Sequence, residues 1–222
     1  MILLMPVFPW RPQPSDLYHY ALSRAMFAMD AASGDRLDLE MVAMLDDVVD
    51  RAQREWGLTV RSKVAMMGTS AAGVFTNIFA LMHPERIAAA AIGFPGLVFT
   101  VPASAAEDGT PLPYPIGTAD FSQLTGIEPD VDAYCRLPLY FFVGEEDTLD
   151  GVPDPRLFPD DVRATAERFY GEADAVKRWD LGEKLYAEYG CERTQFWTYP
   201  GVEHHFTPLM KDDLLDFFAI EA

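Results

Sequence analysis

Cysteine is nearly absent from this chain of 222 residues, which contains only Cys135 and Cys191. Two cysteines are too few for a disulfide scaffold, and a chain of this length buries enough apolar surface to fold without one. The count still allows a single bridge. Isolated cysteines usually serve as small buried hydrophobic residues, so we expect both thiols to be reduced, as in a cytoplasmic protein.

Basic residues are also scarce. The chain has 17 lysines and arginines against 35 aspartates and glutamates, which gives a formal net charge of -18 at pH 7. Such a surface repels the phosphates of nucleic acids and the anionic headgroups of lipids. The charge therefore argues against nucleic acid or a membrane surface as a partner.

No apolar run approaches the roughly 18–20 residues that a membrane-spanning helix needs. The first five residues, Met1 to Met5, are apolar, but they have no basic leader and no small-residue cleavage site after them. We therefore expect neither a membrane span nor a secretory signal, which again favours a cytoplasmic location.

The apolar residues that are present suffice for one core. They make up half of the chain, and its length fits a single domain over residues 1–222. Apolar runs of strand length alternate with stretches of helical spacing, which predicts an α/β fold with a mainly parallel sheet and helices on both faces. The expected strands are residues 2–8, 63–67, 87–92, 137–143 and 195–199, and the expected helices are residues 16–29, 39–56, 71–82, 159–189 and 208–220.

Residues 97–137 differ in composition from the rest of the chain. They contain five prolines, at positions 102, 111, 113, 115 and 129, together with several glycines and acidic residues. A segment this long is uncommon as a plain connector in a compact domain. We therefore expect a lid or a substrate-binding loop there.

The most informative stretch joins the strand expected at 63–67 to the helix expected at 71–82. It reads GTSAAG over residues 68–73, with small residues on both sides of Ser70, as the tight turn of a nucleophile elbow requires. At the helix N-terminus, free N–H groups and the positive end of the dipole can stabilise an oxyanion. The usual pattern is G-x-S-x-G, and here Ala72 takes the place of the last glycine. The same residues also suit an ordinary helix N-terminus packed with small side chains.

A serine hydroxyl needs a base, and a group that orients the base, before it can act as a nucleophile. Candidates for both follow later strands. The strand expected at 137–143 leads into GEED at residues 144–147, and the strand expected at 195–199 leads into PGVEHHF at residues 200–206. The carboxyl ends of parallel strands lie together, so these turns should meet Ser70. The order serine, acid, histidine is one known from serine hydrolases.

These motifs resemble the α/β-hydrolases, in particular the esterase group related to dienelactone hydrolases and polyhydroxyalkanoate depolymerases. The resemblance rests on GTSAAG at 68–73, HPERI at 83–87, GEED at 144–147 and PGVEH at 200–204, and it spans residues 64–206. Dienelactone hydrolases use a cysteine nucleophile, whereas this chain has serine at the elbow. The resemblance implies hydrolysis of a small-molecule ester, or a related acyl compound, without a cofactor.

The resemblance also assigns roles to individual residues. Ser70 is implied to be the nucleophile, His204 the general base and Asp147 the acid that orients the histidine. The family's spacing selects His204 rather than its neighbour His205. One N–H group of the oxyanion hole is implied to come from Ala71, the residue after the nucleophile.

The amino-terminal part departs from the family. The leading strands are absent, no clear strand precedes residues 63–67, and PVFPW at residues 6–10 stands where the family has its HGGG-type oxyanion loop. The second oxyanion donor should come from this loop. Because Pro9 has no N–H group, the donor is Phe8 or Trp10, and we favour Phe8.

Several alternatives stay open. Asp150 competes with Asp147 as the acid of the triad, and an acidic turn can also simply be solvated. The spacing of the aspartates after residue 146 is not that of a calcium loop, so we expect no metal. The alternative from another class is a non-catalytic ligand-binding protein of the same fold. Among enzymes the alternative is an amide or peptide hydrolase, because the same triad serves both reactions.

The last expectation concerns assembly. Without leading strands, residues 2–8 should form an apolar strand at or near one edge of a sheet of about five strands. Such an edge invites pairing with another chain unless it is covered, for instance by residues 10–38. A longer product that supplies the missing strands is the third explanation. We expect a homodimer, because two-fold pairing is the commonest way to close such a surface.

Overall fold

The computed structural model describes residues 2–8, 22–24, 27 and 36–222. Most of the helix expected at 16–29 lies outside these residues, and so does Trp10. The described elements are α2 (Leu37–Trp56), β1 (Val64–Thr69), α3 (Ala71–Met82), the 3-10 helix η3 (Pro84–Arg86), β2 (Ile87–Gly93), α4 (Phe121–Thr125), α5 (Val131–Cys135), β3 (Leu139–Gly144), α6 (Asp160–Tyr170), α7 (Ala175–Glu188), β4 (Thr194–Tyr199) and α8 (Pro208–Glu221).

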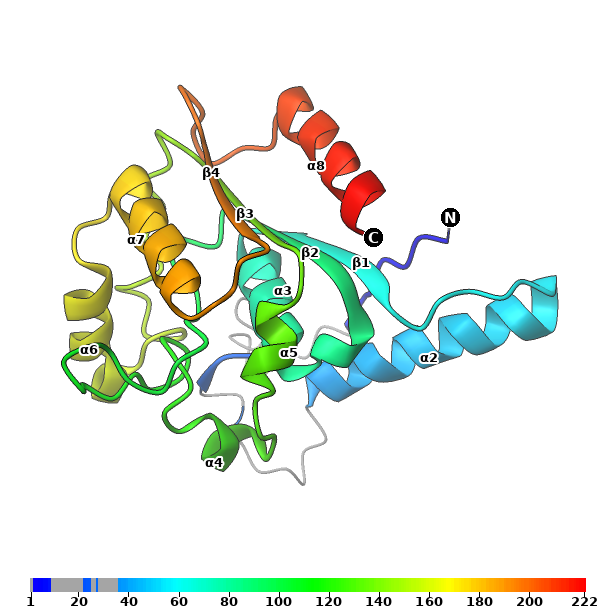
Figure 1. The fold of residues 1–222 in the computed structure, drawn as a ribbon, viewed down its shortest axis with the longest axis horizontal. Coiled ribbons are helices and arrows are strands. Elements are labelled where there is room, and N and C mark those ends of the chain that lie inside the picture. Colours follow the sequence, from blue (N-terminus) through cyan, green and yellow to red (C-terminus); the bar gives the residue numbers. More distant parts are fainter. Residues whose placement is uncertain (1, 9–21, 25–26, 28–35) are drawn as a thin grey trace.

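The strands form a parallel sheet in the order β1-β2-β3-β4 (Figure 1). In register, Gly68 lies opposite Ile92, Ile92 opposite Phe141 and Phe141 opposite Phe196, so one row of residues crosses the whole sheet. All four strands therefore end at the same edge. This confirms the expected parallel sheet and places the turns after β1, β3 and β4 on one side of the molecule.

Helices cover both faces of the sheet, as expected (Figure 1). On one face the rings of Phe141 and Phe196 stack with centroids 4.5 Å apart, and Phe196 packs against Trp179 of α7. On the other face Tyr140 packs against Phe217 of α8. Because side chains alternate along a strand, each face of the sheet presents its own aromatic residues to the helices that cover it.

The prediction of a strand at residues 2–8 was wrong. These residues form no strand, the sheet has four strands in the described part of the chain, and β1 lies at its edge. Leu4 and Phe8 pack against the core, whereas Leu3, Met5 and Val7 are 74–78% exposed. An apolar run becomes a strand only when its backbone groups find partners on a neighbouring strand, and composition alone does not provide them.

Residues 97–137 are built into the core. Their large apolar side chains Leu97, Phe99, Tyr114 and Phe121 are 0–2% exposed. The segment contains the short helices α4 and α5, which the sequence did not predict. A role of this segment toward a substrate stays a prediction.

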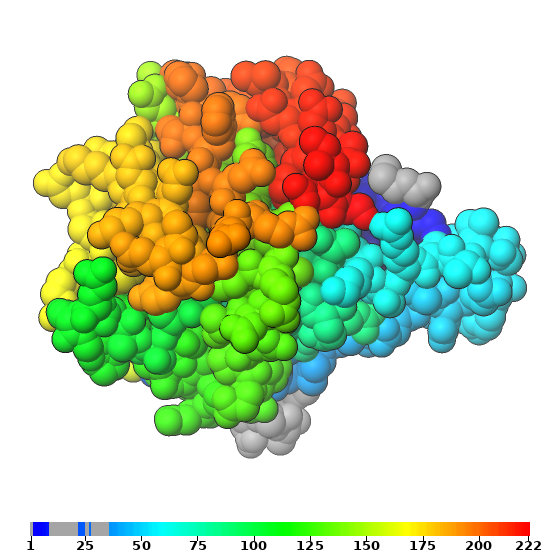
Figure 2. Space-filling view, in the orientation of Figure 1, coloured from blue at the N-terminus to red at the C-terminus, as the bar shows by residue number. Residues whose placement is uncertain are grey.

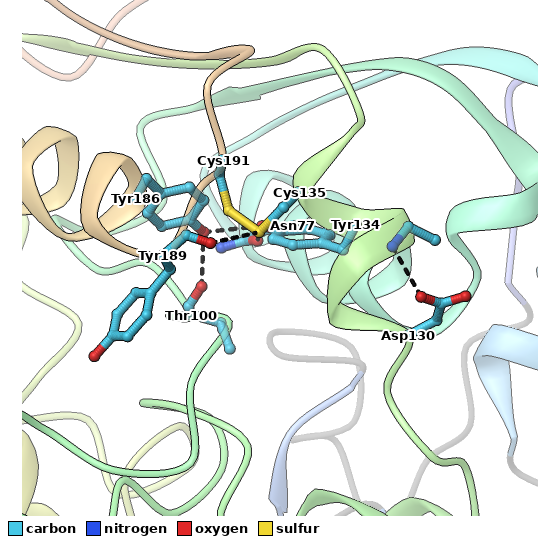
Figure 3. The surroundings of a disulfide bond; sticks show 9 residues. Asn77, Thr100, Asp130, Tyr134, Cys135, Tyr186, Tyr189 and Cys191 are labelled. Carbon is cyan, nitrogen blue, oxygen red and sulfur yellow. Dashed lines mark hydrogen bonds between the residues drawn. A yellow bond between two sulfur atoms is a disulfide. The ribbon is translucent and has the colours of Figure 1, made fainter.

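The expectation of reduced thiols was also wrong, because Cys135 and Cys191 form a disulfide bond (Figure 3). The sheet register explains the pairing. Leu139 lies opposite Thr194, so the residues that lead into β3 and β4 run side by side. The pairing removes the argument for a cytoplasmic location that rested on free thiols.

A buried network of hydroxyl groups lies beside this disulfide (Figure 3). The Tyr134 hydroxyl donates to Asn77 Oδ1 at 2.8 Å and lies 2.9 Å from the Tyr186 hydroxyl, which donates to the Thr100 carbonyl at 2.6 Å. The network joins α3, α5 and α7. It leaves these buried polar groups with hydrogen-bond partners, as a stable core requires.

Helix α2 is tied to the end of α3 by a buried carboxylate. Asp38 is fully buried, receives two hydrogen bonds of 2.8 Å from Arg36, and lies 3.0 Å from His83 Nε2. Burial alone would raise the pKa of Asp38, but the hydrogen bonds from Arg36 and His83 outweigh it and lower the pKa to about 2. The far end of α2 and its connection to β1 project from the body (Figure 2).

None of the helices in the described ranges is long and apolar enough to cross a bilayer.

Candidate active site

Ser70 lies on a sharp turn between β1 and α3. Its backbone φ is 58° and its ψ is -129°, a conformation that costs energy for any residue except glycine. The turn is held because the Ser70 N–H group donates to the Gly93 carbonyl at 2.8 Å. Ser70 is exposed at the end of the sheet.

Two glycines make this turn sterically feasible. A Cβ atom on Gly68 would lie 2.0 Å from the Ala72 carbonyl oxygen, and one on Gly73 would lie 2.6 Å from the Gly93 carbonyl oxygen. Ala72 itself is exposed. The departure from the G-x-S-x-G pattern is therefore explained: the close contact with β2 falls on Gly73, and position 72 has room for a methyl group.

Asp147 and His204 meet on the turns after β3 and β4. Asp147 is 3% exposed, and its Oδ2 atom lies 2.8 Å from His204 Nδ1. Asp147 Oδ1 accepts a second hydrogen bond, from the Leu149 N–H group at 2.9 Å. The carboxylate is thus fixed on both oxygens, and it holds the imidazole through Nδ1. Among the described residues no hydrogen bond is made by His204 Nε2.

The turn that carries His204 folds back across the sheet. Gly144 at the end of β3 comes so close to this turn that a Cβ atom would lie 2.1 Å from the Val202 carbonyl oxygen. Two residues further on, the His204 ring packs against Phe94, just after β2, with centroids 5.2 Å apart. The histidine therefore lies over the end of β2, whose Gly93 is hydrogen-bonded to Ser70.

No hydrogen bond joins the Ser70 hydroxyl to His204 in the described part of the structure. Hydrogen bonds between catalytic groups are often long in an unliganded enzyme and shorten in the substrate complex. The structure thus brings Ser70, Asp147 and His204 to the same edge of the sheet, and it shows direct contact for the latter two.

The competing residues have other surroundings. Asp150 accepts two hydrogen bonds from the Arg178 guanidinium, at 2.7 and 3.1 Å, and within the described residues no hydrogen bond joins it to His204. His205 is exposed, with its N–H group bound to the Glu203 carbonyl. The geometry at this site therefore favours Asp147 over Asp150 and His204 over His205.

The candidate oxyanion donors lie beside α3. Ala71 is the first residue of α3, where N–H groups have no acceptor within the helix. Phe8 packs its ring against Phe75, one helical turn after Ala71, with centroids 6.0 Å apart. Phe8 is thus near the same helix end, and its role as second donor stays a prediction.

A cleft of about 490 Å³ lies elsewhere, at the opposite ends of the strands. It is lined by residues that precede the strands, among them Lys63, Arg136 and Arg193. Because Ser70 follows β1 and His204 follows β4, this cleft is separated from these two residues by the length of the sheet.

Sequence reasoning missed two residues that shape the site. Phe94, which supports the His204 ring, and Arg178, which binds Asp150, carry no motif that sequence alone could have identified. No group of three or more histidine, cysteine, aspartate or glutamate residues suited to a metal ion occurs among the described residues.

Comparison with known proteins identifies the fold class. No family model and no curated protein matches the chain. Among solved structures it resembles poly(aspartic acid) hydrolase-1 from Sphingomonas sp. KT-1, with a TM-score of 0.53 and 20% identity over 80% of this chain and 62% of that one. It also resembles LpqC, a poly(3-hydroxybutyrate) depolymerase from Bordetella parapertussis, with a TM-score of 0.53 and 17% identity over 80% of this chain and 57% of that one.

The chain therefore has the α/β-hydrolase fold. It spans less than two thirds of the length of the two solved structures that it resembles.

Proposed function

We propose that this protein is a serine hydrolase that cleaves a carboxylic ester through a Ser70–His204–Asp147 triad. The observation that carries the proposal is the hydrogen bond between Asp147 and His204 beside the strained turn of Ser70. A half-buried histidine held by a buried carboxylate is suited to accept a proton from the serine hydroxyl.

The proposed reaction follows from this arrangement. Ser70 Oγ attacks the ester carbonyl while His204 Nε2 takes the hydroxyl proton, and Asp147 stabilises the imidazolium that forms. The negative charge on the carbonyl oxygen is stabilised by the N–H group of Ala71 and by the positive end of α3, with Phe8 as the proposed second donor. His204 then returns its proton to the leaving alcohol, and water, activated by the same histidine, hydrolyses the acyl-enzyme.

Charge favours a neutral substrate. The chain carries a net charge of -18, and Glu145, Glu146 and Glu203 are exposed on the turns that bear the triad. This field repels anionic polymers and anionic esters and leaves neutral esters unaffected. It supports a neutral carboxylic ester as the substrate class.

A fluorophosphonate probe tests the nucleophile, because it labels only an activated serine. We expect labelling of the native chain, hydrolysis of p-nitrophenyl esters, and loss of both in Ser70→Ala, with turnover falling by about 10³-fold or more. Ser62→Ala, at an exposed serine away from the turn, is the control and should label normally.

Two outcomes would contradict the proposal. Unchanged labelling in Ser70→Ala would assign the nucleophile to another serine. A native chain that neither labels nor hydrolyses esters or p-nitroanilides would favour the alternative of a non-catalytic ligand-binding protein, and turnover of p-nitroanilides alone would favour an amide hydrolase.

A further inference from the structure

Arg178 is a buried guanidinium at the start of α7. Its side chain is 1% exposed, and all three nitrogens donate hydrogen bonds. Two go to the Asp150 carboxylate, and three go to the carbonyl groups of Leu97, Gly171 and Glu172, at 2.9–3.2 Å. The planar fork of arginine suits this set of fixed acceptors, which a lysine ammonium could not satisfy together.

The two loops that Arg178 joins are the ones that hold His204. Asp150 lies three residues after Asp147, whose carboxylate binds His204 Nδ1. Leu97 lies three residues after Phe94, whose ring packs against the His204 ring. One guanidinium therefore fixes the loop that orients the imidazole and the loop that supports its face.

The loops are also joined to each other at this point. The Gly151 N–H group donates to the Gly96 carbonyl at 2.7 Å, next to Asp150 and Leu97, two of the residues that Arg178 binds. The other end of the Asp147 loop is held by the turn after β4, since the Glu146 N–H group donates to the Val202 carbonyl at 2.9 Å. The loop is thus anchored on both sides of Asp147, and Arg178 supplies the charged anchor.

We propose that Arg178 and Asp150 are positioning residues for the triad, which set the orientation of His204 through Asp147 and Phe94 without touching the substrate. This inference rests on the proposed function for its kinetic part and on geometry alone for its structural part. A change in the pair should misplace the imidazole while leaving Ser70 and its turn intact. It should therefore lower kcat more than it changes KM.

Asp150→Asn is the principal test, because it keeps the shape of the side chain and removes its charge. Ester hydrolysis should show kcat reduced by about 10- to 100-fold with KM within about twofold of the native value. Arg178→Lys, which keeps the charge and loses the fork, should also fall below the native kcat. Urea unfolding of each variant establishes that the protein measured is folded.

Asp38→Asn is the matched control. Asp38 also binds an arginine through two hydrogen bonds, from Arg36 at 2.8 Å, and its side chain is buried. This pair lies at the end of α3 opposite to Ser70, away from the loops that hold His204. The variant should lose comparable stability and keep a kcat within about twofold of native.

A second readout does not depend on turnover. The proton shared between His204 Nδ1 and Asp147 gives a downfield NMR resonance, which His204→Ala identifies by its loss. This resonance should shift or broaden in Asp150→Asn and stay in place in Asp38→Asn. If it is unmoved in a folded Asp150→Asn variant, the positioning role is wrong.

The two proposals fail in different ways. A native protein without ester hydrolysis or probe labelling overturns the proposed function, and the NMR comparison still decides the positioning role. An active native protein whose Asp150→Asn variant keeps full kcat overturns only the positioning role. If Arg178→Lys does not fold, Asp150→Asn alone decides.

Discussion

At the scale of single residues, the adjacent histidines His204 and His205 have different surroundings. The His204 side chain is 28% exposed and lies between Asp147 and Phe94, whereas His205 is exposed on the same turn. Neighbouring residues of an extended segment point in different directions, so only one of the two can lie over the end of β2.

The prediction at this scale is a pair of alanine variants. His204→Ala should lower ester hydrolysis by about 10³-fold or more, because the members of a triad act as a unit. His205→Ala should keep turnover within about twofold of native. Initial rates with a p-nitrophenyl ester measure both, and the reverse pattern would show that His205 is the base.

At the scale of elements, the contact between α2 and the end of α3 should respond to acid. Asp38 has a folded-state pKa of about 2, below its ordinary value, because the hydrogen bonds from Arg36 and His83 overcome the effect of burial. A group with a lowered pKa stabilises the fold above its unfolded pKa of roughly 4 and loses that contribution as the pH falls toward 2.

The native protein should therefore lose on the order of 1–2 kcal/mol of unfolding free energy from this group between about pH 5 and pH 2. Asp38→Asn should be less stable at pH 7, and its deficit should shrink over that range. Urea unfolding at a series of pH values measures both proteins. A deficit independent of pH would mean that the Asp38 charge is not what holds α2.

The disulfide between Cys135 and Cys191 is a covalent link between two elements that are distant in the sequence. It connects the end of α5 to the segment before β4 across a sequence separation of 56 residues. Closing so long a loop restricts the unfolded chain and should stabilise the fold by roughly 2–4 kcal/mol.

We expect dithiothreitol to lower the midpoint of urea unfolding of the native protein. The double variant Cys135→Ser, Cys191→Ser should already show the lower midpoint and should not respond to the reductant. Thiol alkylation of the denatured protein, followed by mass spectrometry, checks the bond itself: no label without reductant and two labels after reduction. Two labels without reductant would contradict the bond.

A helix or strand can be predicted from the sequence when residues close to it in the chain determine its structure. The strand before Ser70 and the helix after it follow from a short apolar run, small residues and helical spacing, and both lie within two residues of the expected bounds. Residues 2–8 have an equally apolar run, but a strand also needs a neighbour, which sequence does not reveal.

Contacts between distant residues cannot be predicted from the sequence for the same reason. Arg178 reaches Asp150 across 28 positions, and Cys135 reaches Cys191 across 56. That Ser70, Asp147 and His204 lie at the same edge of the sheet could be predicted because each follows a strand, and parallel strands end together. Phe94 also follows a strand, but a buried aromatic residue gives no indication of which side chain it will support.

At the scale of the whole molecule, the prediction of a homodimer depends on the edge of the sheet formed by β1. In the described residues no strand lies beyond β1, and Met67 of this strand is 44% exposed. The earlier reason for a homodimer, an edge strand at residues 2–8, does not hold. Within the described residues, the outer side of β1 has no neighbouring strand, and we expect this edge to pair with a second copy.

Light scattering at micromolar concentration should therefore give about twice the mass of one chain. The fraction of dimer should rise with salt, because two chains of net charge -18 repel each other until they are screened. Met67→Lys places a charge at this edge and should give a monomer. A monomeric native protein at both low and high salt would contradict pairing at β1.

The turn that carries His204 over β3 to the end of β2 has a consequence for how the protein matures. Synthesis proceeds from the amino terminus, so the ribosome releases the serine turn long before it releases the last strand. In the proposed mechanism, Ser70 has no base until β4 docks and its turn closes over Gly144. We therefore expect a nascent or partly folded chain to be unreactive, so that labelling by an active-site probe during refolding would report when the final strand is in place.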